Sequence, residues 1–276
     1  MQFHEIKDWD DAYANADHIP DAAGYIKRWP KLASAFRKEL LKENRAALDL
    51  SYGKGERNLL DIFYPQDEPK GLMIFVHGGY WYRFSKNDWS HLAAGALEQG
   101  WIVVMPSYSL CPTVRISDIT KEVAKAIEFV AKDIKGPIRL AGHSAGGHLV
   151  VRMICNKSPL SKRVQSRIEH TLAISPVTDL RPLCCLKLNE TLGLSDKEAE
   201  AESPALLTPL PNARVTCWVG AAERSEFVRQ NALLANIWHG LGARITHVEQ
   251  SDRHHFDVVE ELADAESEMV KTLLET

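Results

Sequence analysis

From residue 58 onward, short apolar runs of strand length alternate with longer stretches whose apolar residues recur at helical spacing. The apolar runs cover residues 58–64, 71–77, 101–106, 138–142, 171–175, 215–220 and 243–248. Several of these runs are continuous and rich in β-branched residues, as expected for strands that are covered on both faces. Strands that alternate with helices predict an α/β fold with a mostly parallel central sheet and helices on both faces.

The helical stretches lie at 116–134, 146–156, 226–241 and 256–274. In the first of them, isoleucine and valine recur at spacings of three and four residues, which places them on one face of a helix. The first two predicted strands are joined only by residues 65–70. A link this short favours an antiparallel hairpin, which we expect at an edge of the sheet.

Two segments lack strand patterns. In residues 1–50, Pro30 begins a helical pattern, and proline is well placed in the first turn of a helix. Residues 176–212 contain five prolines and no clear strand. We therefore expect a single α/β domain over residues 1–276, in which both segments are candidates for covering the active site.

The composition excludes several classes of protein. The 276-residue chain is 45% hydrophobic and 25% charged, as in ordinary globular proteins. A formal net charge of −4 and the lack of a Lys/Arg-rich run argue against nucleic acid or an anionic membrane as a partner. No apolar stretch approaches the length of a membrane-spanning helix, so we expect none.

The cysteines, the first residues and the absence of known motifs narrow the expected cellular compartment and the expected cofactors. Five cysteines without a CxxC motif suggest buried free thiols, which suit a reducing cytoplasm. The first residues lack the apolar core of a secretory signal, so we expect a cytoplasmic protein. Neither the zinc motif HExxH nor a glycine-rich nucleotide-binding motif occurs, and we expect no metal and no cofactor.

Residues 142–146 read GHSAG and match the pattern GxSxG. They join a predicted strand to a predicted helix, and such a tight turn forces the central serine, Ser144, into a strained backbone conformation. The glycines on either side let strand and helix approach closely. The Ser144 hydroxyl would then project over the carboxyl end of the sheet, where α/β proteins bind ligands. The alternative is a glycine-rich turn whose serine only caps the helix.

A serine nucleophile needs a general base, and in this architecture an acid and then a histidine follow the serine in the chain. His254 and His255 stand side by side between the last predicted strand and the last predicted helix, where the base is expected. From the residues alone, one can be the base and the other a surface neighbour or a substrate contact.

Three carboxylates are candidates for the acid that orients the histidine. Glu223 follows the strand at 215–220, and Asp179 follows the previous strand. Asp252 is too close to His255 in the chain to reach it comfortably. The position of Glu223 favours it, and the alternative is a solvated loop carboxylate.

The motif HGGYW occupies residues 77–81, directly after a predicted strand. A developing oxyanion needs preorganised backbone N–H donors, and glycines let the backbone approach a substrate closely. Loops of the HGG type supply such donors. We expect the amides of Gly79 and either Tyr80 or Gly78, together with that of Ala145, to form an oxyanion hole, and the histidine of the motif to hold the loop.

These motifs resemble the α/β-hydrolase superfamily and, more narrowly, kynurenine formamidases of the HGGxW type. The matching stretches are 52–65, 77–81, 107–112, 142–149, 219–230 and 254–262. The resemblance implies an α/β-hydrolase fold with Ser144 as nucleophile, His255 as base and Glu223 as acid. In such enzymes a histidine followed by an aromatic residue is common at the start of the final helix, which favours His255 over His254. An aspartate is frequent where this chain has Glu223.

The resemblance also implies the reaction, which is hydrolysis of N-formyl-L-kynurenine to formate and L-kynurenine through an acyl-enzyme. The partner is then a small aromatic amide or ester. Tyr80, Trp81 and Tyr82 could form an aromatic wall for the substrate ring or pack in the core below the loop, and the sequence leaves both open. His143, next to the nucleophile, is a further candidate for a substrate contact.

Other functions would use the same residues. A carboxylesterase for short acyl or aryl esters, or an amidase for other N-acyl aromatic amines, needs the same triad, and a fold does not name a substrate. A non-catalytic binding protein is disfavoured because the triad positions and the HGG loop are all present. A homodimer formed through an exposed edge strand or helix is compatible with the sequence.

Overall fold

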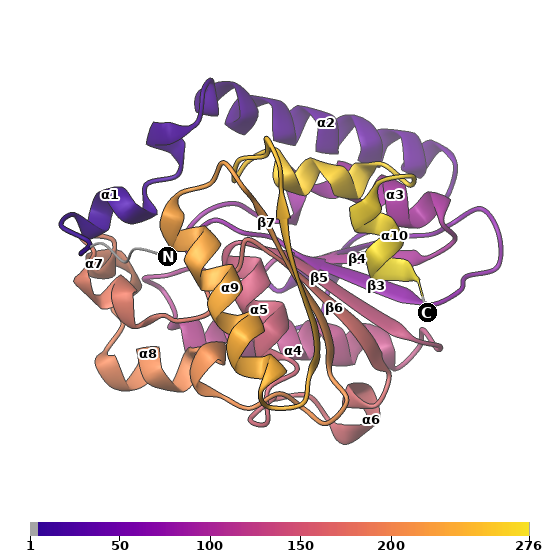
Figure 1. Cartoon of the computed structure of the whole chain (residues 1–276). Helices are drawn as coiled ribbons and strands as arrows, with labels where there is room; N and C mark the ends of the chain where they lie inside the picture. Colours follow the sequence, from indigo (N-terminus) through magenta and orange to yellow (C-terminus); the bar gives the residue numbers. More distant parts are fainter. Residues whose placement is uncertain (1–4, 276) are drawn as a thin grey trace.

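The computed structural model describes residues 5–275 and is built around one eight-stranded sheet (Figure 1). The strands lie side by side in the order β1-β2-β4-β3-β5-β6-β7-β8. Their bounds are β1 Ala46–Ser51, β2 Leu59–Phe63, β3 Leu72–Val76, β4 Ile102–Pro106, β5 Ile138–His143, β6 Ile168–Ile174, β7 Arg214–Gly220 and β8 Arg244–Gln250. Each of the seven predicted strands is present.

The sheet is mostly parallel, as predicted. β4, β3, β5, β6, β7 and β8 run parallel, whereas β2 is antiparallel to both of its neighbours, β1 and β4. The predicted hairpin between β2 and β3 is wrong, because β4 lies between them. A short link sets two strands in opposite directions without making them neighbours, and β4, buried along its whole length, takes the interior place.

The structure adds β1, which lies in the N-terminal segment where the sequence predicts no strand. β1 is an edge strand of half-buried and exposed residues. Its pairing with β2 is irregular between Ala47 and Leu50, and Asp49 within that interval has a φ of 56°. A strand interrupted in this way shows neither regular alternation nor a continuous apolar run, so periodicity does not reveal it.

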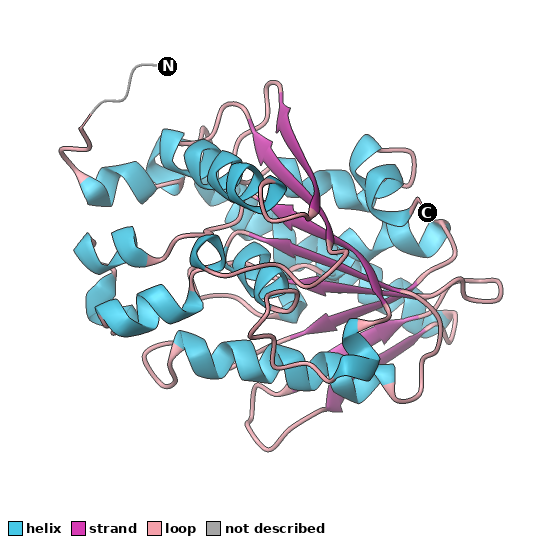
Figure 2. Ribbon diagram, turned by 60° about the horizontal axis from the view of Figure 1, so that its bottom comes forward, coloured by secondary structure: helices cyan, strands magenta, loops and turns pink. Residues whose placement is uncertain are grey.

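Helices cover both faces of the sheet (Figure 1, Figure 2). α2 (Ala22–Lys42), α3 (Ala94–Glu98) and α10 (Glu268–Leu274) pack on one face, where their apolar side chains share a cluster. α4 (Ile116–Ala131), α5 (Ala145–Arg152) and α9 (Ser225–His239) pack on the other face. Within residues 5–275, no helix combines the length and the apolar character that crossing a bilayer requires.

Shorter helical elements fill the connections. The α-helical ones are α1 Trp9–Tyr13, α6 Lys162–Gln165, α7 Asn189–Leu192 and α8 Asp196–Glu202. The 3₁₀ helices are η1 Ala16–His18, η2 Lys86–Asp88, η3 Ser90–Ala93, η4 Arg181–Cys185, η5 Pro204–Leu206 and η6 Val258–Ala263. The proline-containing segment 176–212 therefore forms short helices and no strand.

Two helices have bounds that differ from those predicted from the sequence. α2 begins at Ala22, so Pro30 lies inside it and not in its first turn. A proline inside a helix costs a backbone hydrogen bond, but the buried Trp29 and Leu40 attach α2 to the core on both sides of it. The stretch 256–274 is not one helix. It divides into η6 and α10 because the Ser267 hydroxyl caps a new helix start.

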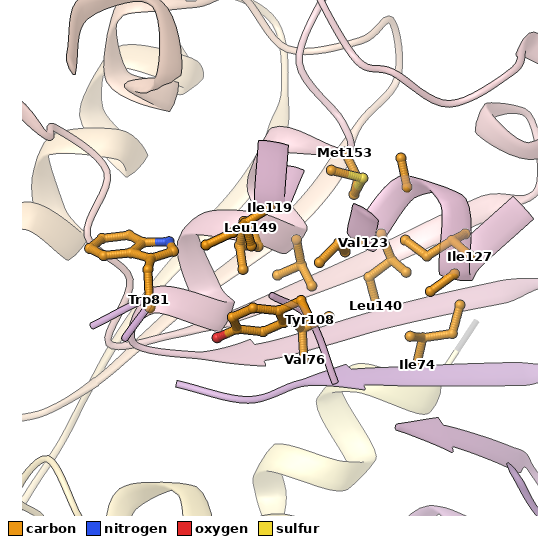
Figure 3. Close-up of a cluster of buried hydrophobic side chains, with 14 of the residues drawn as sticks. Ile74, Val76, Trp81, Tyr108, Ile119, Val123, Ile127, Leu140, Leu149 and Met153 are labelled. Atoms are coloured by element: carbon orange, nitrogen blue, oxygen red, sulfur yellow. The ribbon is translucent and has the colours of Figure 1, made fainter. Parts of the chain in front are cut away.

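The largest buried cluster lies between the sheet and the helices α4 and α5 (Figure 3). Ile74 and Val76 of β3 and Leu140 of β5 belong to it, together with apolar residues of α4 and α5. Figure 3 shows Trp81 in this same cluster, beyond the end of β3. The core thus extends directly beneath the HGGYW loop.

A buried ion pair connects the antiparallel edge of the sheet to the segment after that loop. The Lys86 side chain in η2 is 3% exposed, and its Nζ lies 2.6 Å from Oδ1 of Asp49 and 2.7 Å from Oδ1 of Asp61. The Asp61 side chain is fully buried. Removing one partner from a buried pair leaves an uncompensated charge, so this contact should contribute strongly to stability.

We expect Lys86→Met to lower the free energy of unfolding by about 3–5 kcal/mol, because Asp61 would remain buried without its partner. Urea denaturation followed by circular dichroism measures the change. The control is Lys121→Met, since Lys121 pairs with Asp118 at the surface and should contribute less than about 1 kcal/mol. Equal losses in the two variants would contradict the prediction.

Candidate active site

The predicted site residues gather at the carboxyl edge of adjacent parallel strands. Ser144 follows β5, Glu223 follows β7, and His255 follows β8, while the HGGYW loop at 77–81 follows β3. Ligand sites of α/β proteins lie at this edge. The topology therefore brings together residues that are more than a hundred positions apart in the chain.

Ser144 occupies the strained turn that GxSxG predicts. Its φ of 57° and ψ of −117° lie outside the regions that non-glycine residues favour. A Cβ on Gly142 would lie 2.2 Å from the Gly146 carbonyl oxygen, and a Cβ on Gly146 would lie 1.9 Å from that of Val76. Only glycine fits at these two positions, because β3, β5 and the start of α5 approach so closely.

His255 and Glu223 form a buried pair, and His255 lines the same cavity as Ser144. The two side chains are 4% and 0% exposed, and His255 Nδ1 lies 2.5 Å from Glu223 Oε2. The other carboxylate oxygen, Oε1, accepts a hydrogen bond from the Gly220 amide at 2.9 Å and another from the Ser175 hydroxyl. The carboxylate is thus held by two donors while its free oxygen faces the imidazole.

Ser175 is a site residue that the sequence analysis does not identify. It directly follows β6, is fully buried, and has a φ of 48°. Its amide donates to the Trp218 carbonyl at 2.6 Å, which fixes the turn. The sequence feature that could have identified Ser175 is its position at the end of the predicted strand 171–175. That strand comes between the two strands that carry Ser144 and Glu223.

The alternative candidates for base and acid, His254 and Asp179, interact with other residues. His254 interacts with Asp257, with Nδ1 3.1 Å from its Oδ1, and its ring packs edge-on against Tyr25 of α2. Asp179 forms a two-point ion pair with Arg181 at 2.9 and 2.7 Å. Of the two adjacent histidines, His255 is therefore the one that the structure brings together with Ser144 and a buried carboxylate.

The HGGYW loop is held tightly at its start. His77 stacks on Tyr108 with ring centroids 4.3 Å apart, and its Nδ1 lies 2.7 Å from the Gly78 carbonyl oxygen. Burial lowers the pKa of His77 to about 3, so the ring is neutral near pH 7. This arrangement agrees with the expectation that this histidine holds the loop.

The loop leaves backbone donors free beside Ser144. Gly79, Tyr80 and Trp81 all have positive φ angles, of 112°, 49° and 59°. Within residues 5–275, the amides of Gly79 and Tyr80 donate no hydrogen bond, and that of Ala145 is the first of α5. A Cβ on Gly78 would lie 3.1 Å from the Ser144 Cβ. Free N–H groups next to a serine are the geometry that an oxyanion hole requires.

A cavity of about 230 Å³ opens over Ser144. His143, Ser144 and His255 line it, together with two of the predicted aromatic residues, Tyr80 and Tyr82. The rest of its aromatic lining is Tyr13, Trp29, Phe84, Trp89 and Phe256. A small, mostly apolar pocket with a few polar groups is typical of a small-molecule site.

Trp81 does not reach this cavity. It is fully buried in the core below the loop, and its ring packs edge-on against His148 at 5.2 Å. For Trp81 the core alternative therefore holds, and its assignment as a substrate contact is wrong. Its neighbours in the chain, Tyr80 and Tyr82, line the cavity instead.

His143 lines the cavity as a neutral ring. Burial, together with the nearby His255, keeps the pKa of His143 well below its usual value. Its Nε2 donates to the His255 carbonyl oxygen at 2.9 Å, and the two rings lie 4.6 Å apart. His143 therefore supports the backbone of His255 from inside the pocket.

Residues of the N-terminal segment line part of the cavity. The Tyr80 hydroxyl donates to the Tyr13 carbonyl and accepts from Asn15 Nδ2 at 3.2 Å. The Tyr13 hydroxyl in turn donates to Glu226 of α9 at 3.0 Å. These contacts fix residues 13–17 against both the HGGYW loop and the start of α9, so that the segment forms one wall of the site.

Comparison with known proteins places this geometry in a family. The family model described as BD-FAE matches residues 60–256. Kynurenine formamidase of Danio rerio is 28% identical over 82% of this chain and 80% of its own length. That of Salmo salar is 29% identical over the same shares of the two chains.

Solved structures agree with the fold. A protein of Silicibacter sp. TM1040, described as a candidate thioesterase, is 49% identical, with a TM-score of 0.91 over 96% of this chain and 98% of its own. An esterase of Pyrobaculum calidifontis shares the fold, with 18% identity and a TM-score of 0.67 over 92% of each chain. The chain belongs to the BD-FAE family and is a kynurenine formamidase-like α/β-hydrolase that acts on a bond of the formamide or ester type.

Proposed function

We propose that this hydrolase cleaves aryl formamides, with N-formyl-L-kynurenine as its substrate, through a triad of Ser144, His255 and Glu223. The observation that carries the proposal is the buried His255–Glu223 pair, which lies beside the strained Ser144 at the base of an aromatic cavity. The similarity to kynurenine formamidases supports the choice of substrate. We further propose that residues 1–276 act as one domain whose N-terminal segment completes the pocket.

The first half of the reaction transfers the formyl group to the enzyme. Ser144 Oγ bonds to the formyl carbon while its proton passes to Nε2 of His255. When the tetrahedral intermediate collapses, the carbon–nitrogen bond breaks and the proton passes from His255 to the departing arylamine. An arylamine is a better leaving group than an alkylamine, so this amide is within reach of esterase-type chemistry.

The second half releases formate. A water molecule attacks the formyl-enzyme and gives a proton to His255, and the bond between carbon and Ser144 Oγ breaks as that proton returns to the serine. Glu223 accepts from Nδ1 of His255, which selects the tautomer whose Nε2 can take a proton. The same carboxylate stabilises the imidazolium in both halves.

The free amides of the HGGYW loop would stabilise the negative oxygen of each intermediate. Gly79 and Tyr80 are the donors from the loop, with Gly78 closely packed beside Ser144, and Ala145 is the donor from the start of α5. Each such donor typically accounts for about 10²–10³ in rate. Their positions are fixed by the positive φ angles of the loop, so the hole is preorganised.

A thioesterase or carboxylesterase is the second candidate function. The 49% identity to a candidate thioesterase favours it, and the same triad and oxyanion hole would serve. The two candidates differ in the bond that is cleaved and in what the pocket must hold beyond it.

Substrate comparison separates these functions. We expect a higher kcat/KM for N-formyl-L-kynurenine than for p-nitrophenyl acetate or S-phenyl thioacetate, and a loss of at least about 10⁴-fold for every substrate in Ser144→Ala. Steady-state kinetics with purified protein provides the measurement. Ester or thioester turnover without formamide turnover would leave the triad intact and replace the formamidase proposal.

The neighbouring histidines provide a matched pair of variants. His255→Ala should lower kcat by about 10⁴-fold or more, because it removes the base. His254→Ala leaves the base in place and removes side-chain contacts to Asp257, Tyr25 and the Phe256 amide. Labelling of Ser144 by a fluorophosphonate should likewise be lost in the first variant and kept in the second. Similar losses in both would overturn the assignment of the base.

Ser175→Gly tests how the acid is held. Glycine accepts the φ of 48° without strain, so the variant removes only the hydroxyl that binds Glu223. A hydrogen bond to a charged group contributes about 1.5–3 kcal/mol, and we expect kcat to fall about tenfold with KM nearly unchanged. Ser203→Gly is the control, because the Ser203 hydroxyl donates to the Ala199 carbonyl. A similar fall of kcat in Ser203→Gly would attribute the effect to a less rigid structure and not to the lost hydrogen bond to Glu223.

A further inference from the structure

The cavity over Ser144 is lined by two oppositely charged side chains that the triad does not use. Within the described chain, Asp17 and Arg83 are the only aspartate, glutamate, lysine or arginine residues that line it. They come from different segments, since Asp17 lies in η1 and Arg83 lies just after the HGGYW loop.

Neither charge is used inside the protein. Among residues 5–275, neither Asp17 nor the Arg83 guanidinium forms an ion pair within 4.0 Å or a side-chain hydrogen bond. Other charged residues close by are paired, as Asp11 is with His18 and Arg224. Two unpaired, opposite charges on one small cavity are therefore available to a ligand.

Both residues line the cavity at exposed positions. The Arg83 guanidinium carbon lies 5.1 Å from the ring centroid of Phe84, which itself lines the cavity. Asp17 follows Asn15, which is bonded to the Tyr80 hydroxyl. Both charged residues are exposed, whereas Ser144 is 3% exposed. The cavity thus runs from a buried nucleophile, past an aromatic lining, to a charged mouth.

We propose that Arg83 and Asp17 form a subsite for the α-amino-acid end of the substrate. Arg83 would bind the α-carboxylate, for which a guanidinium offers parallel N–H donors, and Asp17 would bind the α-ammonium group. This inference rests on the proposed function, because it takes the formyl group to lie at Ser144 and the aryl ring to lie among the aromatic side chains. The remaining part of the molecule then reaches the mouth.

The charge pattern fits a zwitterion better than other substrates. An acyl carrier with several phosphates would meet one cation and one anion, and phosphate recognition normally uses several cationic or N–H groups. A simple neutral ester would leave both charges without a role. A zwitterionic amino acid matches one positive and one negative side chain, and it keeps the occupied cavity electrically balanced.

The test compares two substrates that differ only in the amino-acid end. N-formyl-L-kynurenine carries it, and 2′-formamidoacetophenone has the same aryl ketone and formamide without it. We expect the ratio of their kcat/KM values to fall about tenfold in Arg83→Gln and in Asp17→Asn, relative to wild type. The control is Arg244→Gln, because Arg244 is an exposed arginine at the opposite edge of the sheet, and it should keep the wild-type ratio.

The outcomes distinguish this inference from the proposed function. If wild type cleaves both formamides and the ratio stays within twofold in both variants, the subsite is overturned and the formamidase proposal stands. If wild type cleaves neither formamide, the proposed function fails. Binding of L-kynurenine and 2′-aminoacetophenone, measured by calorimetry, then judges the subsite alone, and a loss of affinity confined to L-kynurenine in the variants would support it.

Discussion

The close approach of α5 to the ends of β3 and β5 is the constraint on which the rest of the site depends. No Cβ fits at Gly142 or Gly146, because the Gly146 and Val76 carbonyl oxygens occupy that space. This contact holds Ser144 in its strained conformation, and the strain is supported by packing on both sides. It also places the amide of Ala145, at the start of α5, next to the loop that follows β3. The proposed nucleophile and the proposed oxyanion donors are thus positioned by one packing interaction.

Glu223, the proposed acid, is positioned by a different means. A glutamate is longer than an aspartate by one methylene group, which adds a rotatable bond to the side chain that must hold His255. The Gly220 amide and the Ser175 hydroxyl both donate to the same oxygen of Glu223 and so remove that freedom. Ser175 does this from a left-handed backbone conformation at the end of β6. In this chain the glutamate and this serine thus form one hydrogen-bonded arrangement.

Much of this could be predicted from the sequence, and the failures have identifiable causes. Ser144, His255 and Glu223 follow apolar strands, so the edge on which they meet is set by the parallel sheet. The order of strands was less accessible, because a short link between β2 and β3 does not reveal that β4 lies between them. Trp81 could not be placed from the sequence, because an aromatic side chain next to a loop fits a core as well as a ligand site. Trp29 and Phe84 line the cavity through tertiary contacts that leave no local pattern.

The loop that follows β3 carries the proposed oxyanion donors, and Arg83 of the proposed subsite comes directly after it. Its first residues present free amides to Ser144, and the amide of Arg83 donates to the Gly79 carbonyl at 3.0 Å, which closes the loop on itself. Tyr80 supplies a backbone donor on one side and binds the N-terminal segment through its hydroxyl on the other. Asp17 and Arg83 therefore lie on two segments that meet at Tyr80. Because both segments meet at Tyr80, a shift of either would move the proposed charged subsite and the proposed oxyanion donors together.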